Sequence, residues 1–330
     1  MNFAIWVTSE CNMNCKYCYV DGKKGISFFS KKNVENMIKF IKVVSEKEKK
    51  IKISFFGGEP LLNLDLIQMI IEHCNKELAV KVEYYITTNG LLINEQVAKF
   101  FLDNKIFVSL SWDGCKEAND LNRVDKSGRE TYQRIRKAYH LLKKYGLNNV
   151  RVRATFNCES IKYLRDSIKF FIKEDQDISV MFVPDYFDKN WSEEKIIELH
   201  DVLRHLEKND LGNISIISDN MTKGVCGGGV SNFNIYVDGF IYPCSFVVNE
   251  EQFCIGDIWN GLNKKRIDAL VANYNKPILE CDGCDYADYC LSHKCRYLNW
   301  ALESEINKPS PLVCHLENLK WCSNKKVFID

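Results

Sequence analysis

The chain has 330 residues, of which 46% are hydrophobic and 27% are charged, a composition that favours a folded globular protein over a disordered one. Its 45 basic and 44 acidic side chains nearly cancel, so the overall charge predicts neither a nucleic-acid partner nor attraction to an anionic membrane. The N-terminus does not resemble a signal peptide, and no apolar run approaches the length of about 18 residues that a membrane span needs. We therefore expect a cytoplasmic protein, in which most of the 15 cysteines are metal ligands and do not form a disulfide framework.

Strand-like and helix-like segments alternate six times along the first two thirds of the chain. The predicted strands span residues 3–7, 51–56, 82–87, 106–111, 150–156 and 178–183. The predicted helices span residues 31–45, 62–74, 94–103, 130–145, 161–172 and 192–207. This order predicts an α/β fold of parallel strands covered by helices, a partial (β/α)6 barrel of the TIM type. Reactive residues are then expected on loops at the carboxyl ends of the strands.

Periodicity is clearest in the fourth predicted helix. Its apolar residues recur at three- and four-residue steps, and they are Tyr132, Ile135, Ala138, Tyr139 and Leu142. Residues at this spacing lie on one face of a helix. We expect this stripe to be buried against the sheet.

The loop after the first predicted strand contains Cys11, Cys15 and Cys18, a CX3CX2C triplet. Three thiolates bind three irons of a four-iron cubane and leave the fourth iron for a small ligand, whereas closed zinc and ferredoxin sites take four protein ligands. With Tyr17 directly before the last cysteine, the run resembles the signature of the radical S-adenosylmethionine (SAM) enzymes. The resemblance implies a catalytic 4Fe-4S cluster that binds SAM and cleaves it to a 5′-deoxyadenosyl radical, with Tyr17 beside the cofactor.

Gly57, Gly58 and Glu59 follow the second predicted strand directly. Glycines let the backbone approach a ligand closely, and a carboxylate accepts hydrogen bonds from an ammonium group. The spacing alone is equally typical of an ordinary glycine turn. The run also resembles the GGEP motif of the same family, which implies binding of the SAM amino group.

Polar residues at the next two strand ends extend the resemblance. Asn89 follows the third strand, and Ser111 and Asp113 lie at the end of the fourth, where family segments lie near the nucleoside. Ser111 and Asp113 are candidates for hydrogen bonds to the ribose hydroxyls. Arg123 is the candidate partner of the SAM carboxylate, because a guanidinium binds two oxygens at once, and the alternative for Arg123 is a solvated loop cation.

Cysteines become frequent after about residue 215, where the strand–helix alternation stops. Residues 235–243 predict a β-hairpin closed at Asp238-Gly239, which would bring Cys226 and Cys244 together. The seven cysteines here resemble the SPASM extension of radical SAM enzymes, and they are Cys226, Cys244, Cys281, Cys284, Cys290, Cys295 and Cys314. We therefore expect a SAM-cleaving barrel over residues 1–215 and a small SPASM domain over residues 216–330.

The SPASM resemblance also implies two auxiliary 4Fe-4S clusters, and so three clusters in all. The first would use Cys226, Cys244 and Cys295, and the second would use Cys281, Cys284, Cys290 and Cys314. Taken alone, the second set is also compatible with zinc knuckles. The first set has one cysteine fewer than fully ligated relatives, so either Cys254 or Cys322 completes it, or one iron is open to a substrate thiolate.

Two further cysteines, Cys115 and Cys158, follow the fourth and fifth strands at the reactive end of the barrel. Each is either a hydrogen-atom donor to a substrate radical or an inert packed thiol. The sequence does not choose between these roles.

The resemblance implies that the adenosyl radical abstracts hydrogen from a ribosomally made precursor peptide, forming a thioether or carbon–carbon cross-link. One alternative is anaerobic sulfatase maturation, in which a Cys or Ser becomes formylglycine. In that group an Asp after the hairpin cysteine is the base, and this chain has Ser245, whose hydroxyl does not replace a carboxylate near neutral pH. A second alternative is oxidation or epimerisation of a small molecule. A third is that the protein is not an enzyme but an iron–sulfur carrier or a zinc-binding module.

Expected partners follow from this chemistry. A flavodoxin or ferredoxin would supply electrons to the clusters. The first predicted strand begins at residue 3, so we expect no fused leader-binding domain. Either a separate leader-binding protein or the barrel itself then recognises the precursor peptide.

Overall fold

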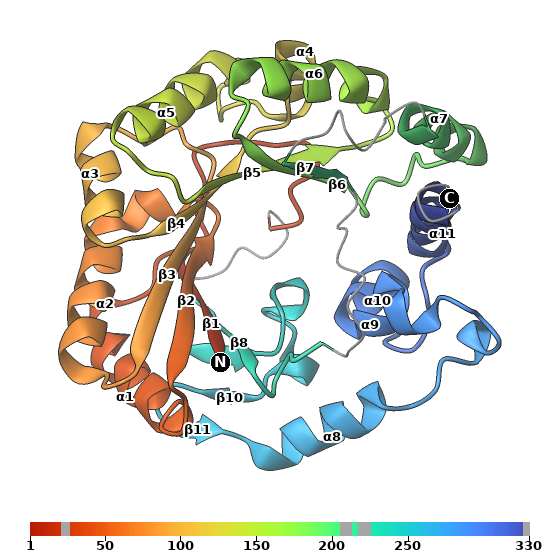
Figure 1. The fold of residues 1–330 in the computed structure, drawn as a ribbon. Coiled ribbons are helices and arrows are strands. Elements are labelled where there is room, and N and C mark those ends of the chain that lie inside the picture. The colour runs from red at the N-terminus through yellow and green to blue at the C-terminus, as the bar shows by residue number, and fades with distance from the viewer. Residues whose placement is uncertain (21–26, 205–212, 217–225, 326–330) are drawn as a thin grey trace.

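The protein is built on one open, curved sheet with helices on its outer face (Figure 1), in a computed structural model that describes residues 1–20, 27–204, 213–216 and 226–325. The strand order among these residues is β11-β10-β9-β8-β1-β2-β3-β4-β5-β6-β7. The parallel strands of the barrel are β1 (Asn2–Thr8), β2 (Lys50–Gly57), β3 (Lys81–Thr88), β4 (Phe107–Ser111), β5 (Val150–Phe156), β6 (Ser179–Pro184) and β7 (Ile214–Ile216). The two ends of the sheet do not pair, so the barrel is partial, as the sequence predicts.

Helices connect these strands and cover their outer face (Figure 1). They are α1 (Val34–Val44), α2 (Leu64–Glu77), α3 (Glu95–Asp103), α4 (Lys116–Asn122), α5 (Tyr132–Lys144), α6 (Leu164–Glu174) and α7 (Glu193–Arg204). The buried face of α5 consists of the predicted stripe from Tyr132 to Leu142. Burial of such apolar stripes stabilises the barrel by about 25 cal/mol for each Å² removed from water.

The six predicted strands and the six predicted helices are confirmed, with ends that differ by a few residues. Two elements of the described part of the barrel, α4 and β7, were missed. The seven residues of α4 include two Asn and one Asp, which favour turns, and β7 has only three described residues. Each is too short to show the periodicity on which the predictions depend.

The chain after residue 226 extends the same sheet and then crosses the open side of the barrel (Figure 1). Its strands are β8 (Asn232–Ile235), β9 (Phe240–Tyr242), β10 (Gly256–Asp257) and β11 (Gly261–Leu262). Its helices are α8 (Lys264–Tyr274), α9 (Leu291–Lys294), α10 (Arg296–Glu303) and α11 (Pro311–Lys325). The predicted hairpin is confirmed, since β8 and β9 pair in antiparallel fashion and Gly239 adopts a φ of 90° in the turn.

β8 pairs in parallel with β1, so the extension is hydrogen-bonded to the first strand of the barrel. A second apolar cluster supports this junction. The buried Trp6 of β1 contacts Phe56 and Tyr236, at ring-centroid distances of 4.9 Å and 5.4 Å. The predicted domain boundary at residues 215–216 stays a prediction, because the sheet runs on from β1 into the extension.

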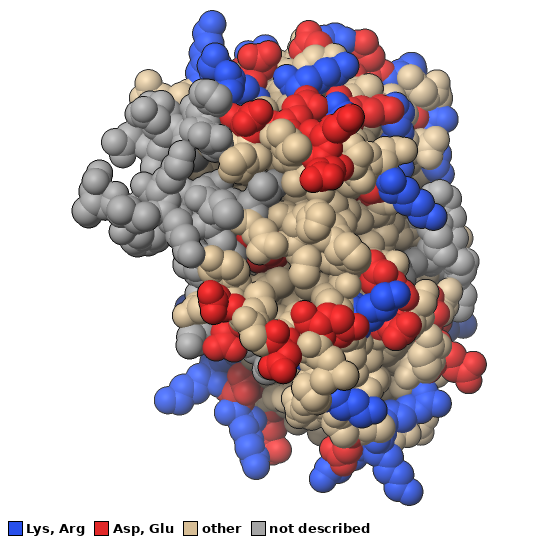
Figure 2. All heavy atoms as spheres, turned by 90° about the vertical axis from the view of Figure 1, so that its right-hand side faces the viewer, with Lys and Arg blue, Asp and Glu red and all other residues tan. Residues whose placement is uncertain are grey.

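The surface on the open side of the barrel carries charges of both signs. In Figure 2, acidic side chains lie above and below a band of uncharged surface on this face. Among the residues that the structure describes, no helix is both long enough and apolar enough to cross a bilayer.

Candidate active site

The cysteine triplet lies on the loop that leaves β1 at its carboxyl end. Backbone bonds fasten this loop to the segment after α4, from Asn14 N to the Val124 oxygen at 2.9 Å and from Lys16 N to the Asn122 oxygen at 3.0 Å. The three thiols share a cavity of about 470 Å³ with several residues predicted to bind SAM, namely Tyr17, Gly57, Gly58, Asn89, Ser111 and Arg123. The structure therefore brings the triplet and most of the predicted cofactor residues together.

Gly57 and Gly58 bring the end of β2 against the loop after β1. Gly57 has a φ of 138°, and a Cβ there would lie 1.9 Å from the Thr8 oxygen. A Cβ on Gly58 would lie 2.2 Å from the Glu10 oxygen, immediately before Cys11. Only glycine fits this contact between two backbones, and the contact fixes the start of the cysteine loop.

Glu59 lies behind the cavity wall, fully buried, with both carboxylate oxygens occupied. It accepts hydrogen bonds from Leu61 N at 3.1 Å, from Thr88 Oγ1 at 2.7 Å and from Asn89 N at 2.7 Å. Burial raises its pKa to about 7, although these donors act in the opposite direction. Asn89 Nδ2 in turn lies 3.7 Å from Cys11 Sγ, so Glu59 positions a neighbour of the first thiol.

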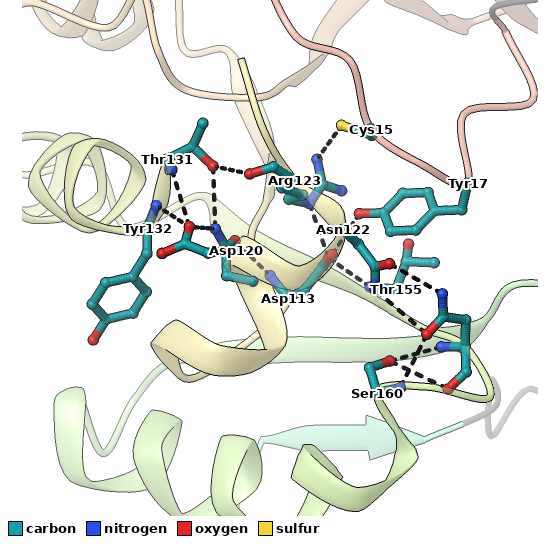
Figure 3. Close-up of polar contacts among 12 residues, drawn as sticks. Cys15, Tyr17, Asp113, Asp120, Asn122, Arg123, Thr131, Tyr132, Thr155 and Ser160 are labelled. Carbon is teal, nitrogen blue, oxygen red and sulfur yellow. Dashed lines mark hydrogen bonds and ion pairs between the residues drawn. The ribbon is translucent and has the colours of Figure 1, made fainter. Parts of the chain in front are cut away.

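Asp113 likewise lies behind the wall, at the centre of the network in Figure 3. Its Oδ1 lies 3.0 Å from Arg123 Nε and accepts from Thr155 N at 2.9 Å, while its Oδ2 accepts from Tyr17 at 2.5 Å. The Arg123 guanidinium lies over the Tyr17 ring at 5.3 Å, and its Nη1 is 3.9 Å from Cys15 Sγ. Arg123 is thus not a solvated loop cation.

The electrostatics of Arg123 follow from this burial. Burial by itself lowers the pKa of the guanidinium, but Asp113 and Tyr17 more than offset that effect and raise the pKa. The group therefore stays positive beside the thiols. A fixed positive charge in a partly closed cavity suits an anionic group such as a carboxylate.

The thiols of the triplet fit a cluster with three protein ligands. Burial raises the pKa of Cys15 to about 12 and also raises that of Cys11. Both are therefore neutral thiols unless a metal supplies the positive charge that favours the thiolate. Among the described residues, no three His, Cys, Asp or Glu side chains converge on a single metal ion. A cubane does not require such convergence, because each thiolate binds a separate iron.

The cysteines of the extension fall into the two predicted groups. Burial raises the pKa of Cys295, and the nearby Cys244 and Cys226 raise it further. In the other group a hydrogen bond between Cys290 and Cys314 raises the pKa of Cys290 and lowers that of Cys314, which also interacts with Cys281 and Cys284. The ligand assignments stay predictions, but the fold brings together the thiols that each assignment requires.

The functions of the remaining cysteines stay undecided between the predicted alternatives. Cys254 Sγ donates to the Gly256 oxygen at 3.4 Å, and the side chain of Cys322 lies outside the described residues. Cys115 accepts from Ser167 Oγ at 3.4 Å. Burial, together with a hydrogen bond to Asp188, raises the pKa of Cys158 to about 12.

A second cavity of about 720 Å³, here called the vestibule, adjoins the first, and the sequence analysis missed its walls. Residues that line both cavities form a shared wall, and they are Tyr17, Cys18, Tyr19, Asp185, Phe187 and Phe246. One signal was available in the sequence. Asp185 comes two residues after the sixth predicted strand and directly after β6, where barrel enzymes place functional side chains.

Comparison with known proteins adds to this geometry. The sequence profile of the Radical SAM superfamily matches residues 6–171. The chain is 26% identical to a cysteine-type anaerobic sulfatase-maturating enzyme of Clostridium perfringens, over 91% of this chain and 90% of that protein.

Two solved structures share the fold. Native anSMEcpe with bound AdoMet and Kp18Cys peptide has a TM-score of 0.80 at 23% identity, covering 98% of this chain and 99% of that one. Streptococcus suis SuiB bound to precursor peptide SuiA has a TM-score of 0.67 at 16% identity, covering 95% of this chain and 75% of that one. The likeness extends through both the barrel and the cysteine-rich extension.

Proposed function

The chain belongs to the radical SAM superfamily, and from that premise we propose that it modifies a ribosomally made peptide, forming a thioether or carbon–carbon cross-link. The family implies a 4Fe-4S cluster and SAM, which together supply a 5′-deoxyadenosyl radical when bound. We propose two auxiliary clusters in the extension as well, held by the two groups of thiols.

The observation that carries the proposal is the shared cavity. Cys11, Cys15 and Cys18 would hold the cluster there. Gly57 and Gly58 line the cavity and hold the start of the cysteine loop in place, and Arg123 offers a fixed positive charge to a carboxylate.

A peptide substrate is supported by the vestibule and by the relatives. The vestibule adjoins the cavity and, at about 720 Å³, has room for several side chains. Two proteins with this fold have been solved with a peptide bound, one with Kp18Cys and one with SuiA. We further propose a flavodoxin or ferredoxin as the electron donor, and peptide recognition either by a separate leader-binding protein or by the barrel.

Sulfatase maturation is the second candidate, because the similarity to a sulfatase-maturating enzyme covers nearly the whole chain. Ser245 argues against it. This residue follows Cys244 and lines the cavity, at the position where the resemblance implies a basic carboxylate. A serine hydroxyl is too weak a base to take up the proton.

The first experiment tests SAM cleavage. Anaerobically reconstituted protein is given SAM and dithionite, and 5′-deoxyadenosine is measured. We expect release by the wild type and none by the variant with Cys11, Cys15 and Cys18 replaced by Ala, which should keep the iron of the extension. Full release by that variant would refute the proposed role of the triplet.

The second experiment separates the two candidate products. The enzyme is incubated with the short peptides encoded beside its gene and with a sulfatase-derived Cys peptide, and the products are analysed by mass spectrometry. A cross-link removes two hydrogen atoms, whereas formylglycine formation also replaces sulfur by oxygen. Formylglycine as the main product would favour the second candidate.

A further inference from the structure

Asp185 has a buried carboxylate in the wall between the two cavities. Its exposure is 8%, and it directly follows β6. Its Oδ1 accepts a hydrogen bond from Phe187 N at 3.0 Å. Within the described part of the chain, no Lys, Arg or His forms an ion pair with it. A buried carboxylate of this kind is unfavourable unless a partner reaches it, and a ligand in the cavity can be that partner.

The charges around Asp185 increase this need for a cation. Burial, together with a smaller effect of the nearby Asp188 carboxylate, raises its pKa to about 6 against the backbone donors of Phe187 and Asp188, so the group is still mainly ionised at neutral pH. The vestibule wall also includes Glu159 and Glu250, so its four carboxylates face two lysines, Lys16 and Lys189. The excess of negative charge favours a positively charged group in the vestibule.

Three aromatic side chains from separate segments of the chain pack against one another in the same wall. The ring centroids of Tyr19 and Phe187 lie 5.9 Å apart, those of Tyr19 and Phe246 lie 5.3 Å apart, and those of Phe187 and Phe246 lie 5.9 Å apart. All three residues line both cavities. Aromatic faces attract cations and also pack against the apolar stem of a long side chain.

We propose that Asp185, together with the aromatic wall of Tyr19, Phe187 and Phe246, binds a lysine or arginine side chain of the substrate. A cation held there fixes which neighbouring residue of the peptide reaches the SAM cavity. The inference deepens the proposed function, because it takes the substrate to be a peptide and assigns it a basic anchor residue.

The test compares two small probes on the cluster-loaded enzyme under anaerobic conditions. Nα-acetyl-lysine methylamide carries the cation, and Nα-acetyl-norleucine methylamide has a similar stem without it. Both lack a free terminal amine, so only the side chain distinguishes them. Ligand-observed NMR should show that the lysine probe binds about tenfold more tightly, the gain expected from one charge-assisted contact in a partly buried site.

Variants assign the preference to its source. Asp185→Asn retains an acceptor for Phe187 N but removes the charge, and it should abolish the preference for lysine while leaving norleucine binding unchanged. Unchanged norleucine binding also shows that the variant is folded. Glu159→Gln is the matched control, since this carboxylate is in the same vestibule but its side chain is 61% exposed, and it should keep the preference within about twofold. Phe246→Leu leaves the charge in place but removes an aromatic face, so it should weaken binding of the lysine probe more than binding of the norleucine probe.

The inference is overturned if the wild type binds both probes equally, or if Asp185→Asn keeps the preference. The proposed function is judged separately, by product formation on whole peptides. Modified peptides without a lysine preference would overturn the inference alone. A lysine preference without any modified peptide would overturn the peptide chemistry and leave the cation site standing.

Discussion

The buried pair of Asp113 and Arg123 gives the sharpest test of the site's construction. Their side chains are 1% and 7% exposed, and Oδ1 lies 3.0 Å from Nε. Asp113→Asn keeps the shape but leaves the arginine charge buried without its counter-charge. Breaking a buried pair from one side costs about 3–5 kcal/mol. We therefore expect the thermal midpoint to fall by roughly 5–10 °C.

A surface pair is the control for this prediction. Lys195 and Glu198 lie closer together, at 2.6 Å, but their side chains are 40% and 37% exposed. Glu198→Gln should therefore lower the free energy of unfolding far less than Asp113→Asn does, because water screens the pair. The midpoints are measured by circular dichroism on protein with equal iron content, since bound cofactor itself raises the midpoint.

A double variant identifies the physical cause. Adding Arg123→Met to Asp113→Asn removes the stranded charge, so the double variant should be less destabilised than the sum of the single variants by about 1–3 kcal/mol. If Asp113→Asn costs no more than Glu198→Gln, or if the single effects simply add, the reasoning from burial is wrong.

Three further predictions follow from the site. Gly58→Ala places a Cβ 2.2 Å from the Glu10 oxygen, so release of 5′-deoxyadenosine should fall at least about tenfold. Gly128→Ala meets no atom within 4 Å and is strained only by its backbone φ of 74°, so it should lose far less of this release. Glu59 has a pKa raised from 4.5 to about 7 by burial, so the stability that its neutral form contributes is complete below pH 4.5 and is lost as the pH rises to about 7. The unfolding midpoint of Glu59→Gln should therefore improve relative to wild type across that window, and a constant difference from pH 4 to pH 8 would contradict this. Cys281→Ala should lose the iron of one cluster and stop product formation, while SAM cleavage persists. The control is Cys74→Ala, at a thiol buried on α2, which should keep all of its iron. Equal iron contents in the two variants would show that Cys281 is not a ligand.

The barrel could be predicted from the sequence because its signals are local. The predicted strand at residues 150–156 coincides with β5, and the apolar stripe of α5 is buried in full. Each of these elements is long enough for its period to show within its own residues. The cysteine triplet was equally readable, since its ligand spacing lies within one loop.

The hydrogen-bond network behind the cavity wall could not be predicted. Glu59 and Asp113 were expected beside SAM, but their carboxylates accept from residues that lie 29, 30 and 42 positions further along the chain. Partners at that separation are set by how the strands align, which no local pattern reports. The same holds for Asp185, whose position in a shared wall depends on loops from three parts of the chain.

The pairing of β1 with β8 has a consequence for synthesis of the protein. Until the ribosome has made the strand that begins at Asn232, one side of β1 has no partner, and an unpaired edge recruits other strands. At usual translation rates this interval lasts roughly 10–50 s. The nascent barrel therefore exposes this strand edge for longer than a barrel whose first strand pairs only with early segments.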